Sequence, residues 1–161
     1  MERGLVHQLN VSWGGVPKRP IAEARVTAEG VEGDFHHDPR HGGPRAALCL
    51  YTLEQIERLR AEGHPIFPGS AGENVTLAGV PLETLTPGTR LRLGDEVEIE
   101  ITHYTTPCKT IAASFSDGDF TRISQKLHPG ESRVYAKALR TGELRTGDVA
   151  RVLAADEALS D

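Results

Sequence analysis

The chain is poor in cysteine: its 161 residues include only Cys49 and Cys108, and they form no CxxC pair. Two cysteines are too few for the disulfide framework of a small secreted domain. Without a CxxC pair, neither a structural zinc site nor a thioredoxin motif is supported. We therefore expect both thiols to be reduced.

Long apolar runs are also absent. The sequence contains no stretch of 18 apolar residues that could form a transmembrane helix, and residues 1–10 lack the apolar segment of a signal peptide. These absences predict a cytoplasmic protein with no membrane partner.

Positive charge is not in excess either. The chain has 18 Lys and Arg against 23 Asp and Glu, a formal net charge of −5, and no basic stripe with interleaved aromatic residues. A nucleic-acid polymer is therefore not an expected partner. Net charge does not describe a single pocket, so a local positive site for one small anion stays open.

What is present is the composition of one globular domain, with 38% hydrophobic and 25% charged residues. A chain of this length can bury most of the surface that its unfolded form exposes. We expect a single domain over residues 1–161, with a core of about residues 6–153 and an acidic, frayed tail at residues 154–161.

Short β-type runs separated by Gly, Pro and Asp predict a mainly β fold, a barrel with a few short peripheral helices. In the clearest run, residues 97–101, strict alternation places three aliphatic side chains on a buried face and Glu98 and Glu100 in water. Gly94-Asp95 precedes it as a hairpin turn. The predicted strands cover residues 6–13, 24–27, 46–51, 75–77, 90–93, 97–102, 134–139 and 148–153.

Helices are expected to be few. The clearest begins after Thr52, whose hydroxyl can cap it while Gln55 reaches back in a capping box, and it ends at Gly63. A second helix is predicted around residues 120–127, and a short helical turn at residues 110–115.

Cys108 is the strongest candidate for chemistry. It lies between the 97–102 strand and the 110–115 turn, which would bring unpaired backbone N–H groups and Lys109 close to its sulfur. Both favour the thiolate, the form required for nucleophilic attack, persulfide formation and soft-metal ligation. The alternative is a plain structural cysteine in a loop. Cys49 lies in the apolar 46–51 run and is expected to be buried and inert.

A turn-rich loop, residues 34–43, contains three histidines and two aspartates. These could be nitrogen and oxygen ligands of a metal, although their spacing matches no zinc template; solvated or hydrogen-bonded histidines are the alternative. Gly42-Gly43 suits a second role better, in which backbone N–H groups approach a phosphate that Arg45 then pairs.

A second glycine loop, GSAGEN at residues 69–74, has polar side chains that could read the hydrogen-bonding edges of a heterocycle. A tight barrel corner is the equal alternative. Lys18 and Arg133 are spare cations of the kind that a phosphate needs, although such residues are most often solvated surface charges.

Taken together, five short motifs in this order resemble those of the MOSC family, named after the C-terminal domain of molybdenum-cofactor sulfurases. The resemblance runs from about residue 6 to residue 153 and is greatest to short stand-alone bacterial members of the YiiM type. The motifs are Val31-Glu32-Gly33-Asp34, His41-Gly42-Gly43, Gly72-Glu73-Asn74, Pro107-Cys108-Lys109 and the segment from Gly142 to Gly147-Asp148.

The resemblance implies a MOSC-type β-barrel that binds a molybdopterin-type molybdenum cofactor, with Cys108 as the catalytic residue that ligates molybdenum or carries persulfide sulfur. A soft thiolate suits a soft metal centre, and the phosphate of the pterin needs cations and glycine N–H groups. The residues expected to bind the cofactor are Lys18, Asp34, His41, Gly42, Gly43, Arg45, Glu73, Asn74, Lys109 and Arg133.

The implied activity is that of a molybdenum-dependent oxidoreductase, because related branches of the family reduce N-hydroxylated compounds, nucleobases included. The sequence shows no pyridoxal-phosphate desulfurase domain, iron–sulfur cysteine set or flavin fingerprint, so electrons would come from a separate ferredoxin or flavoprotein. One alternative is a carrier of sulfur or of molybdenum cofactor that uses a persulfide on Cys108 and a separate sulfur donor. Another is a hydrolase that pairs Cys108 with His103 or His41. A homodimer is compatible with barrels of this kind.

Overall fold

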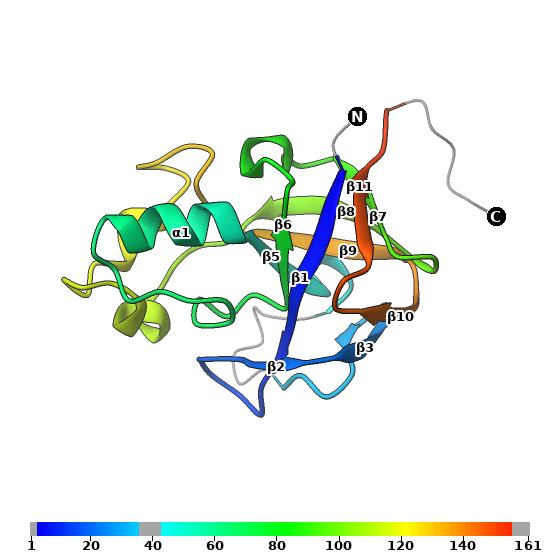
Figure 1. Cartoon of the computed structure of the whole chain (residues 1–161), viewed down its shortest axis with the longest axis horizontal. Coiled ribbons are helices and arrows are strands. Elements are labelled where there is room, and N and C mark those ends of the chain that lie inside the picture. The colour runs from blue at the N-terminus through cyan, green and yellow to red at the C-terminus, as the bar shows by residue number, and fades with distance from the viewer. Residues whose placement is uncertain (1–2, 36–42, 156–161) are drawn as a thin grey trace.

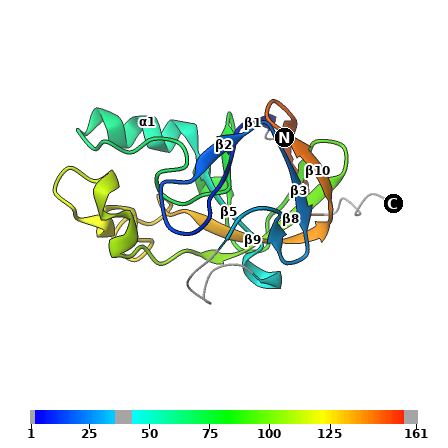
Figure 2. The ribbon, with the colours of Figure 1, turned by 90° about the horizontal axis from the view of Figure 1, so that it is seen from below.

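Seven strands close into a barrel in the computed structural model, which describes residues 3–35 and 43–155. β5 and β6 run parallel, and the other neighbours in the ring are antiparallel. Figure 1 shows the barrel from the side, and Figure 2 shows it from below. In order around the ring, the strands are β11 (Val149–Val152), β7 (Arg90–Leu93), β8 (Val97–Tyr104), β9 (Val134–Arg140), β5 (Leu48–Thr52), β6 (Val75–Ala78) and β1 (Arg3–Val11), which pairs with β11.

Short elements surround this ring. β2 (Arg19–Ile21) pairs with β1, and a second sheet contains β10 (Gly142–Arg145), β3 (Glu23–Thr27) and β4 (Gly30–Val31). The α-helix α1 (Leu53–Ala61) packs beside β5 and β6. The 3₁₀-helices are η1 (Pro44–Ala46), η2 (Leu82–Thr84), η3 (Lys109–Ser114) and η4 (Phe120–Ile123).

The mainly β barrel that the sequence predicts is confirmed, and each of the eight predicted runs overlaps an observed strand. The sequence pattern does not reveal β2, β4 and β10. These strands have three, two and four residues, too few to establish a period of two.

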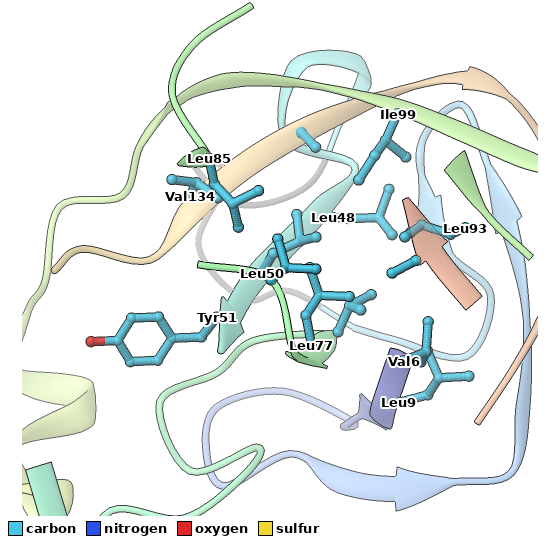
Figure 3. Packing of buried hydrophobic residues seen from close by; sticks show 14 of the residues in the cluster. Val6, Leu9, Leu48, Leu50, Tyr51, Leu77, Leu85, Leu93, Ile99 and Val134 are labelled. Carbon is cyan, nitrogen blue, oxygen red and sulfur yellow. The ribbon is translucent and has the colours of Figure 1, made fainter. Parts of the chain in front are cut away.

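Aliphatic side chains fill the barrel. Val6, Leu48, Leu77, Leu93 and Ile99, from five different strands, are fully buried and point toward one another in Figure 3. Each such side chain contributes about 1.5–3 kcal/mol relative to its exposed state. This interior core holds the strand ends that carry the polar residues described below.

Glu98 departs from the predicted alternation. The three aliphatic residues of 97–101 are buried as predicted, and the Glu100 side chain is 31% exposed, but that of Glu98 is only 1% exposed. The prediction that both glutamates face water is therefore wrong for Glu98. Arg92 and Arg140 lie opposite it on the two neighbouring strands, and long arginine stems can cover a carboxylate between them.

α1 begins and ends where the sequence predicts. Thr52 Oγ1 accepts a hydrogen bond from the Gln55 amide at 3.3 Å, and Gly63 follows the C-cap with a left-handed φ of 103°. The prediction that the Gln55 side chain reaches back to complete the capping box is wrong, because this side chain instead donates to Glu131 Oε1 at 3.1 Å.

The helix predicted around residues 120–127 is wrong beyond residue 123. η4 ends at Ile123, and Ser124 returns to an extended backbone with φ −74° and ψ 131°. Leu127, whose burial would extend the apolar face, is 58% exposed, so no packing stabilises another helical turn. The turn predicted at residues 110–115 is confirmed as η3.

Two of the predicted segments fall wholly or partly outside the described residues. The first is the predicted acidic tail, of which residues 156–161 are not described. The second is the 34–43 loop, of which residues 36–42 are not described. The residues singled out there by the sequence are His36, His37, Asp38, His41 and Gly42. In the part of the chain that the structure describes, no helix has both the length and the apolar character needed to span a membrane.

Candidate functional site

Cys108 lies beyond the end of β8, where the chain turns into η3. It is the N-cap residue of η3 with an extended backbone, and the Ile111 amide donates to its carbonyl at 3.1 Å. Its Sγ lies 2.9 Å from Thr110 Oγ1, and the residue is partly exposed. Lys109, the next residue, is exposed. The thiol is therefore within reach of solvent and next to a hydroxyl group.

Two contacts fix the segment that carries Cys108. Ser114, at the end of η3, donates through Oγ to the carbonyl and the hydroxyl of Ser70 at 3.2 and 3.0 Å. Before Cys108, the Thr105 amide donates to the carbonyl of Arg133 at 3.1 Å. Cys108 is thus held between the 69–74 loop and the start of β9.

Asp34 joins several parts of a buried polar network. Its Oδ2 accepts hydrogen bonds from Lys18 Nζ at 2.5 Å and from Asn74 Nδ2 at 2.8 Å, and its Oδ1 accepts from the Ser12 amide at 2.9 Å. The Lys18 and Asp34 side chains are 7% and 1% exposed. Lys18 is therefore not the spare cation that the sequence suggests, because its charge is already paired.

Glu73 and Asn74 point into the protein. Asn74 Oδ1 accepts from the Cys49 amide at 3.0 Å, and Glu73 Oε2 accepts from the Gly69 amide at 3.0 Å and from Thr76 Oγ1 at 2.9 Å. Both side chains make hydrogen bonds within the protein, as expected of a tight barrel corner.

The backbone of this loop requires glycine at its first position. Gly69 has a φ of +90°, and a Cβ atom there would lie 2.5 Å from the Lys18 carbonyl oxygen. The Lys18 amide donates to the Gly69 carbonyl at 2.9 Å. The close approach ties the β1–β2 connection to the 69–74 loop.

Arg133 is buried beneath the same loop. It is 5% exposed and donates from Nη1 to the Ala71 carbonyl at 2.7 Å. Within the described residues, its Nε and the Oε1 of Glu73 are buried without a hydrogen-bond partner. Unpartnered buried groups cost about 1–3 kcal/mol each. Burial raises the pKa of Glu73, and the Arg133 charge opposes that rise.

Cys49 lies within this cluster but has an inert environment. It is 5% exposed, as predicted for a buried cysteine, and burial raises the pKa of its thiol to about 11. The charges of Arg133, Glu73, Lys18 and Asp34 all act on this thiol. These four charged residues therefore lie near enough to Cys49 to act on it electrostatically.

Arg45 and Gly43 lie beside the paired strands β8 and β9. Arg45, on η1, is exposed, and its carbonyl accepts from Thr102 Oγ1 at 2.6 Å. Burial and then the Arg45 charge lower the pKa of His103. Gly43 has a left-handed φ of 82°, but its N–H donates to the Glu29 carbonyl at 3.1 Å rather than pointing to a free phosphate position.

The structure thus brings five predicted site residues, Lys18, Asp34, Glu73, Asn74 and Arg133, into one cluster. Sequence reasoning missed Asn10 and Thr76, although Asn10 Nδ2 donates to the Glu73 carbonyl at 3.1 Å and to Thr76 Oγ1 at 3.2 Å. The available signal was Asn10 between Leu9 and Val11 in the predicted 6–13 strand. Among residues 3–35 and 43–155, no group of three or more His, Cys, Asp or Glu side chains is placed to hold a metal.

Comparison with known proteins gives one family and two relatives by sequence. Residues 37–151 match the family model described as MOSC domain. YflK of Bacillus subtilis is 30% identical over 136 residues, which are 83% of this chain and 60% of YflK. A Gibberella moniliformis protein named "Reductase" is 28% identical over 132 residues, 79% of this chain and 23% of that protein. The chain therefore spans less than two thirds of either relative.

Solved structures share the barrel. YiiM of Escherichia coli has a TM-score of 0.70 at 21% identity and is matched over 98% of this chain and 72% of its own. YiiM of Geobacillus stearothermophilus has a TM-score of 0.68 at 20% identity, and the match covers 94% of this chain and 75% of that YiiM chain. YuaD of Bacillus subtilis has a TM-score of 0.72 at 18% identity, and the match covers 93% of this chain and 95% of the YuaD chain. These likenesses confirm the predicted type of barrel.

Proposed function

Because the chain belongs to the MOSC domain family, we propose that it binds a molybdopterin-type molybdenum cofactor through Cys108 and reduces N-hydroxylated compounds there. The observation that carries this proposal is the contrast between the two cysteines. Cys108 is partly exposed at the start of η3, whereas Cys49 is buried. A thiol that ligates an external metal must be accessible and ionisable, and only Cys108 meets the first condition.

The residues fit an anionic, metal-carrying cofactor better than a bare metal ion. No described group of His, Cys, Asp and Glu side chains could hold a metal by itself, so a metal at Cys108 needs further ligands from its cofactor. The unpartnered Nε of buried Arg133 is a donor suited to an anionic group. When bound, the molybdenum centre supplies two-electron redox chemistry.

The residues of the chain take separate roles in this proposal. Cys108 is the metal ligand, and the Thr110 hydroxyl, 2.9 Å from its sulfur, orients the thiolate by hydrogen bonding. Arg133, Arg45 and Lys109 supply positive charge toward the phosphate of the pterin. Lys18, Asp34, Glu73 and Asn74 are positioning residues, because their bonds hold the loops rather than project outward.

The overall reaction consumes two electrons and two protons. The N–O bond of the substrate breaks, the nitrogen is reduced to the N–H form, and the oxygen leaves as water. A ferredoxin or a flavoprotein delivers the electrons. The name "Reductase" of the Gibberella moniliformis relative agrees with this class of reaction.

The test is reduction of an aromatic amidoxime with a chemically reduced viologen dye as electron donor, on protein produced in a host that makes molybdenum cofactor. Wild type and the matched variant Cys49→Ala should turn over, and Cys108→Ala should fall to background. Turnover by Cys108→Ala at the wild-type rate would contradict the proposal.

The same proteins test the sulfur-carrier alternative. If wild type shows no turnover but, after incubation with a low-molecular-weight persulfide that hands its outer sulfur to the thiol, gains a sulfur mass shift that Cys108→Ala lacks, Cys108 carries sulfur instead. That outcome replaces the reductase proposal and keeps Cys108 as the functional residue.

A further inference from the structure

His103 lies at one end of a row of side chains on the outer wall of the barrel. Cys49 on β5 pairs directly with Tyr135 on β9, and Tyr135 pairs directly with His103 on β8. These three strands are adjacent (Figure 1). Cys49 and Tyr135 pack with Ala46 in a small cluster apart from the barrel core. At the other end of the row, the Cys49 amide donates to Asn74 Oδ1 at 3.0 Å. The row therefore connects His103 to the polar network of the candidate site.

A β-bulge sets the direction of the His103 side chain. Ile101 pairs with Ala136, and His103 pairs with the adjacent Tyr135, so β8 has one residue more than β9 at this point. The extra residue is Thr102. Bulges interrupt the alternation of a strand and re-aim its side chains. As a result, the neighbouring side chains of Thr102 and His103 meet, with Oγ1 and Nδ1 2.8 Å apart.

The Thr102 hydroxyl fixes the tautomer of His103. Its Oγ1 lies 2.6 Å from the Arg45 carbonyl oxygen and 3.2 Å from the Tyr135 carbonyl oxygen. Carbonyl oxygens only accept, so the single hydroxyl proton of Thr102 is directed to them rather than to the imidazole. Thr102 Oγ1 then offers only lone pairs to His103. Nδ1 of the neutral ring is therefore the donor, and Nε2 carries the lone pair.

The Nε2 lone pair is open to a ligand. Partial burial and then the Arg45 charge lower the pKa of His103 from its ordinary value of 6.5, so the neutral ring predominates at neutral pH. The Tyr135 ring holds the imidazole, with ring centroids 5.0 Å apart and planes tilted by 38°. In the part of the chain that the structure describes, Nε2 of this exposed residue has no hydrogen-bond partner. The geometry presents a preorganised acceptor to the outside.

His103 is also close to Cys108 along the chain. Cys108 follows it by five residues, so their Cα atoms are at most about 18 Å apart. The Thr105 amide donates to the Arg133 carbonyl at 3.1 Å, which continues the contact between the two chain segments past the end of β8 toward Cys108. A ligand that is held at Cys108 and extends along this wall can therefore reach His103.

We propose that His103 Nε2 accepts a hydrogen bond from the substrate and orients it, through an O–H or N–H group beside the N–O bond. The inference rests on the proposed reductase function and names the feature that its substrates share. An amidoxime has such donor groups, whereas pyridine N-oxide has an N–O bond but no donor hydrogen. A neutral acceptor therefore selects N-hydroxylated compounds over N-oxides, because an N-oxide leaves Nε2 without a partner.

The first experiment needs no turnover. Two-bond proton–nitrogen correlation spectra are recorded at about pH 8 on the full chain, labelled at its histidine nitrogens and produced in a host that makes molybdenum cofactor. His103→Phe assigns the resonances. His103 should be protonated at Nδ1 and bare at Nε2, and Thr102→Val should release this preference. Benzamidoxime should shift the Nε2 resonance, and pyridine N-oxide should not. A wild-type ring protonated at Nε2, or equal shifts with both compounds, would overturn the proposal.

The second experiment separates binding from turnover. His103→Phe keeps an aromatic ring beside Tyr135 but removes the acceptor, so the KM for benzamidoxime should rise by about tenfold while kcat changes less. His7→Phe is the matched control at an exposed histidine on β1 and should behave as wild type. An unchanged KM in His103→Phe would overturn the proposal. Loss of molybdenum from His103→Phe would also overturn it, because His103 would then serve the cofactor.

Failure of this inference can be distinguished from failure of the proposed function. If wild type reduces benzamidoxime and His103→Phe has the same KM, the reductase proposal stands and the role of His103 is wrong. If wild type shows no turnover, the reductase proposal fails. The Nε2 resonance then decides by itself whether His103 binds the amidoxime, and an unshifted resonance overturns the inference as well.

Discussion

Lys18 Nζ lies 2.5 Å from Asp34 Oδ2, and the side chains of this ion pair are 7% and 1% exposed. The pair joins the β1–β2 connection to the segment that follows β4. Asn74 also donates to Asp34, so the same carboxylate reaches the 69–74 loop. The pair therefore fixes the relative positions of three segments around the candidate site.

Removal of one partner of this pair should be more harmful than removal of both. Lys18→Met leaves the Asp34 carboxylate buried without its cation, and we expect the free energy of unfolding to fall by about 3–5 kcal/mol. The double variant Lys18→Met/Asp34→Asn should be more stable than Lys18→Met alone. Urea unfolding of wild type, Lys18→Met, Asp34→Asn and the double variant measures the coupling energy between the two side chains. Strictly additive losses of stability would contradict a paired role.

The two cysteines should differ in their rates of alkylation. Because burial raises the pKa of Cys49 to about 11 and leaves the residue only 5% exposed, iodoacetamide at about pH 8 should label Cys108 and spare Cys49 in the folded protein. Intact-mass spectrometry should show one adduct on wild type and on Cys49→Ala, and none on Cys108→Ala. In urea, wild type should take up two. Native labelling of Cys49 at the rate of Cys108 would refute the buried, inert assignment.

Glu73 should make stability depend on pH. Because burial raises its pKa above the usual 4.5, the folded state binds more protons than the unfolded state between the two pKa values. The contribution of Glu73 to the free energy of unfolding should therefore be largest below about pH 4.5 and should fall as the pH rises through the folded pKa, by at most about 1.4 kcal/mol per pH unit.

Glu73→Gln provides the comparison. Its amide oxygen can still accept from the Gly69 amide and Thr76 Oγ1, but the side chain does not titrate. Urea unfolding from about pH 4 to about pH 8 should show that the difference in stability between Glu73→Gln and wild type shifts in favour of the variant as the pH rises. A constant difference across this range would show that Glu73 does not titrate differently in the folded state.

Local rules predict much of the barrel. Alternation identifies the buried face at Val97, Ile99 and Ile101, and the Thr52 cap marks the start of α1. The apolar run around Cys49 predicts its burial correctly. Each of these features depends on residues that are close together in the sequence.

The remaining features depend on contacts between distant segments. The Lys18 and Asp34 side chains are 16 residues apart and meet through loops, so each alone reads as a surface charge. Glu98 is buried because arginines on both neighbouring strands flank it. Arg3, Arg151 and Arg92 become neighbours only through the strand register. Composition and periodicity do not encode register or loop packing.

The central claim is that Cys108 holds a molybdenum cofactor, and the most direct measurement is elemental analysis for molybdenum together with pterin fluorescence after oxidation. Wild type, Cys108→Ala and Cys49→Ala are compared after production in a host that makes the cofactor, with thermal unfolding as the check that each is folded. We predict near-stoichiometric molybdenum and pterin in wild type and Cys49→Ala, and loss of the metal in Cys108→Ala. Equal metal in wild type and Cys108→Ala, or neither metal nor pterin in wild type, would contradict the claim.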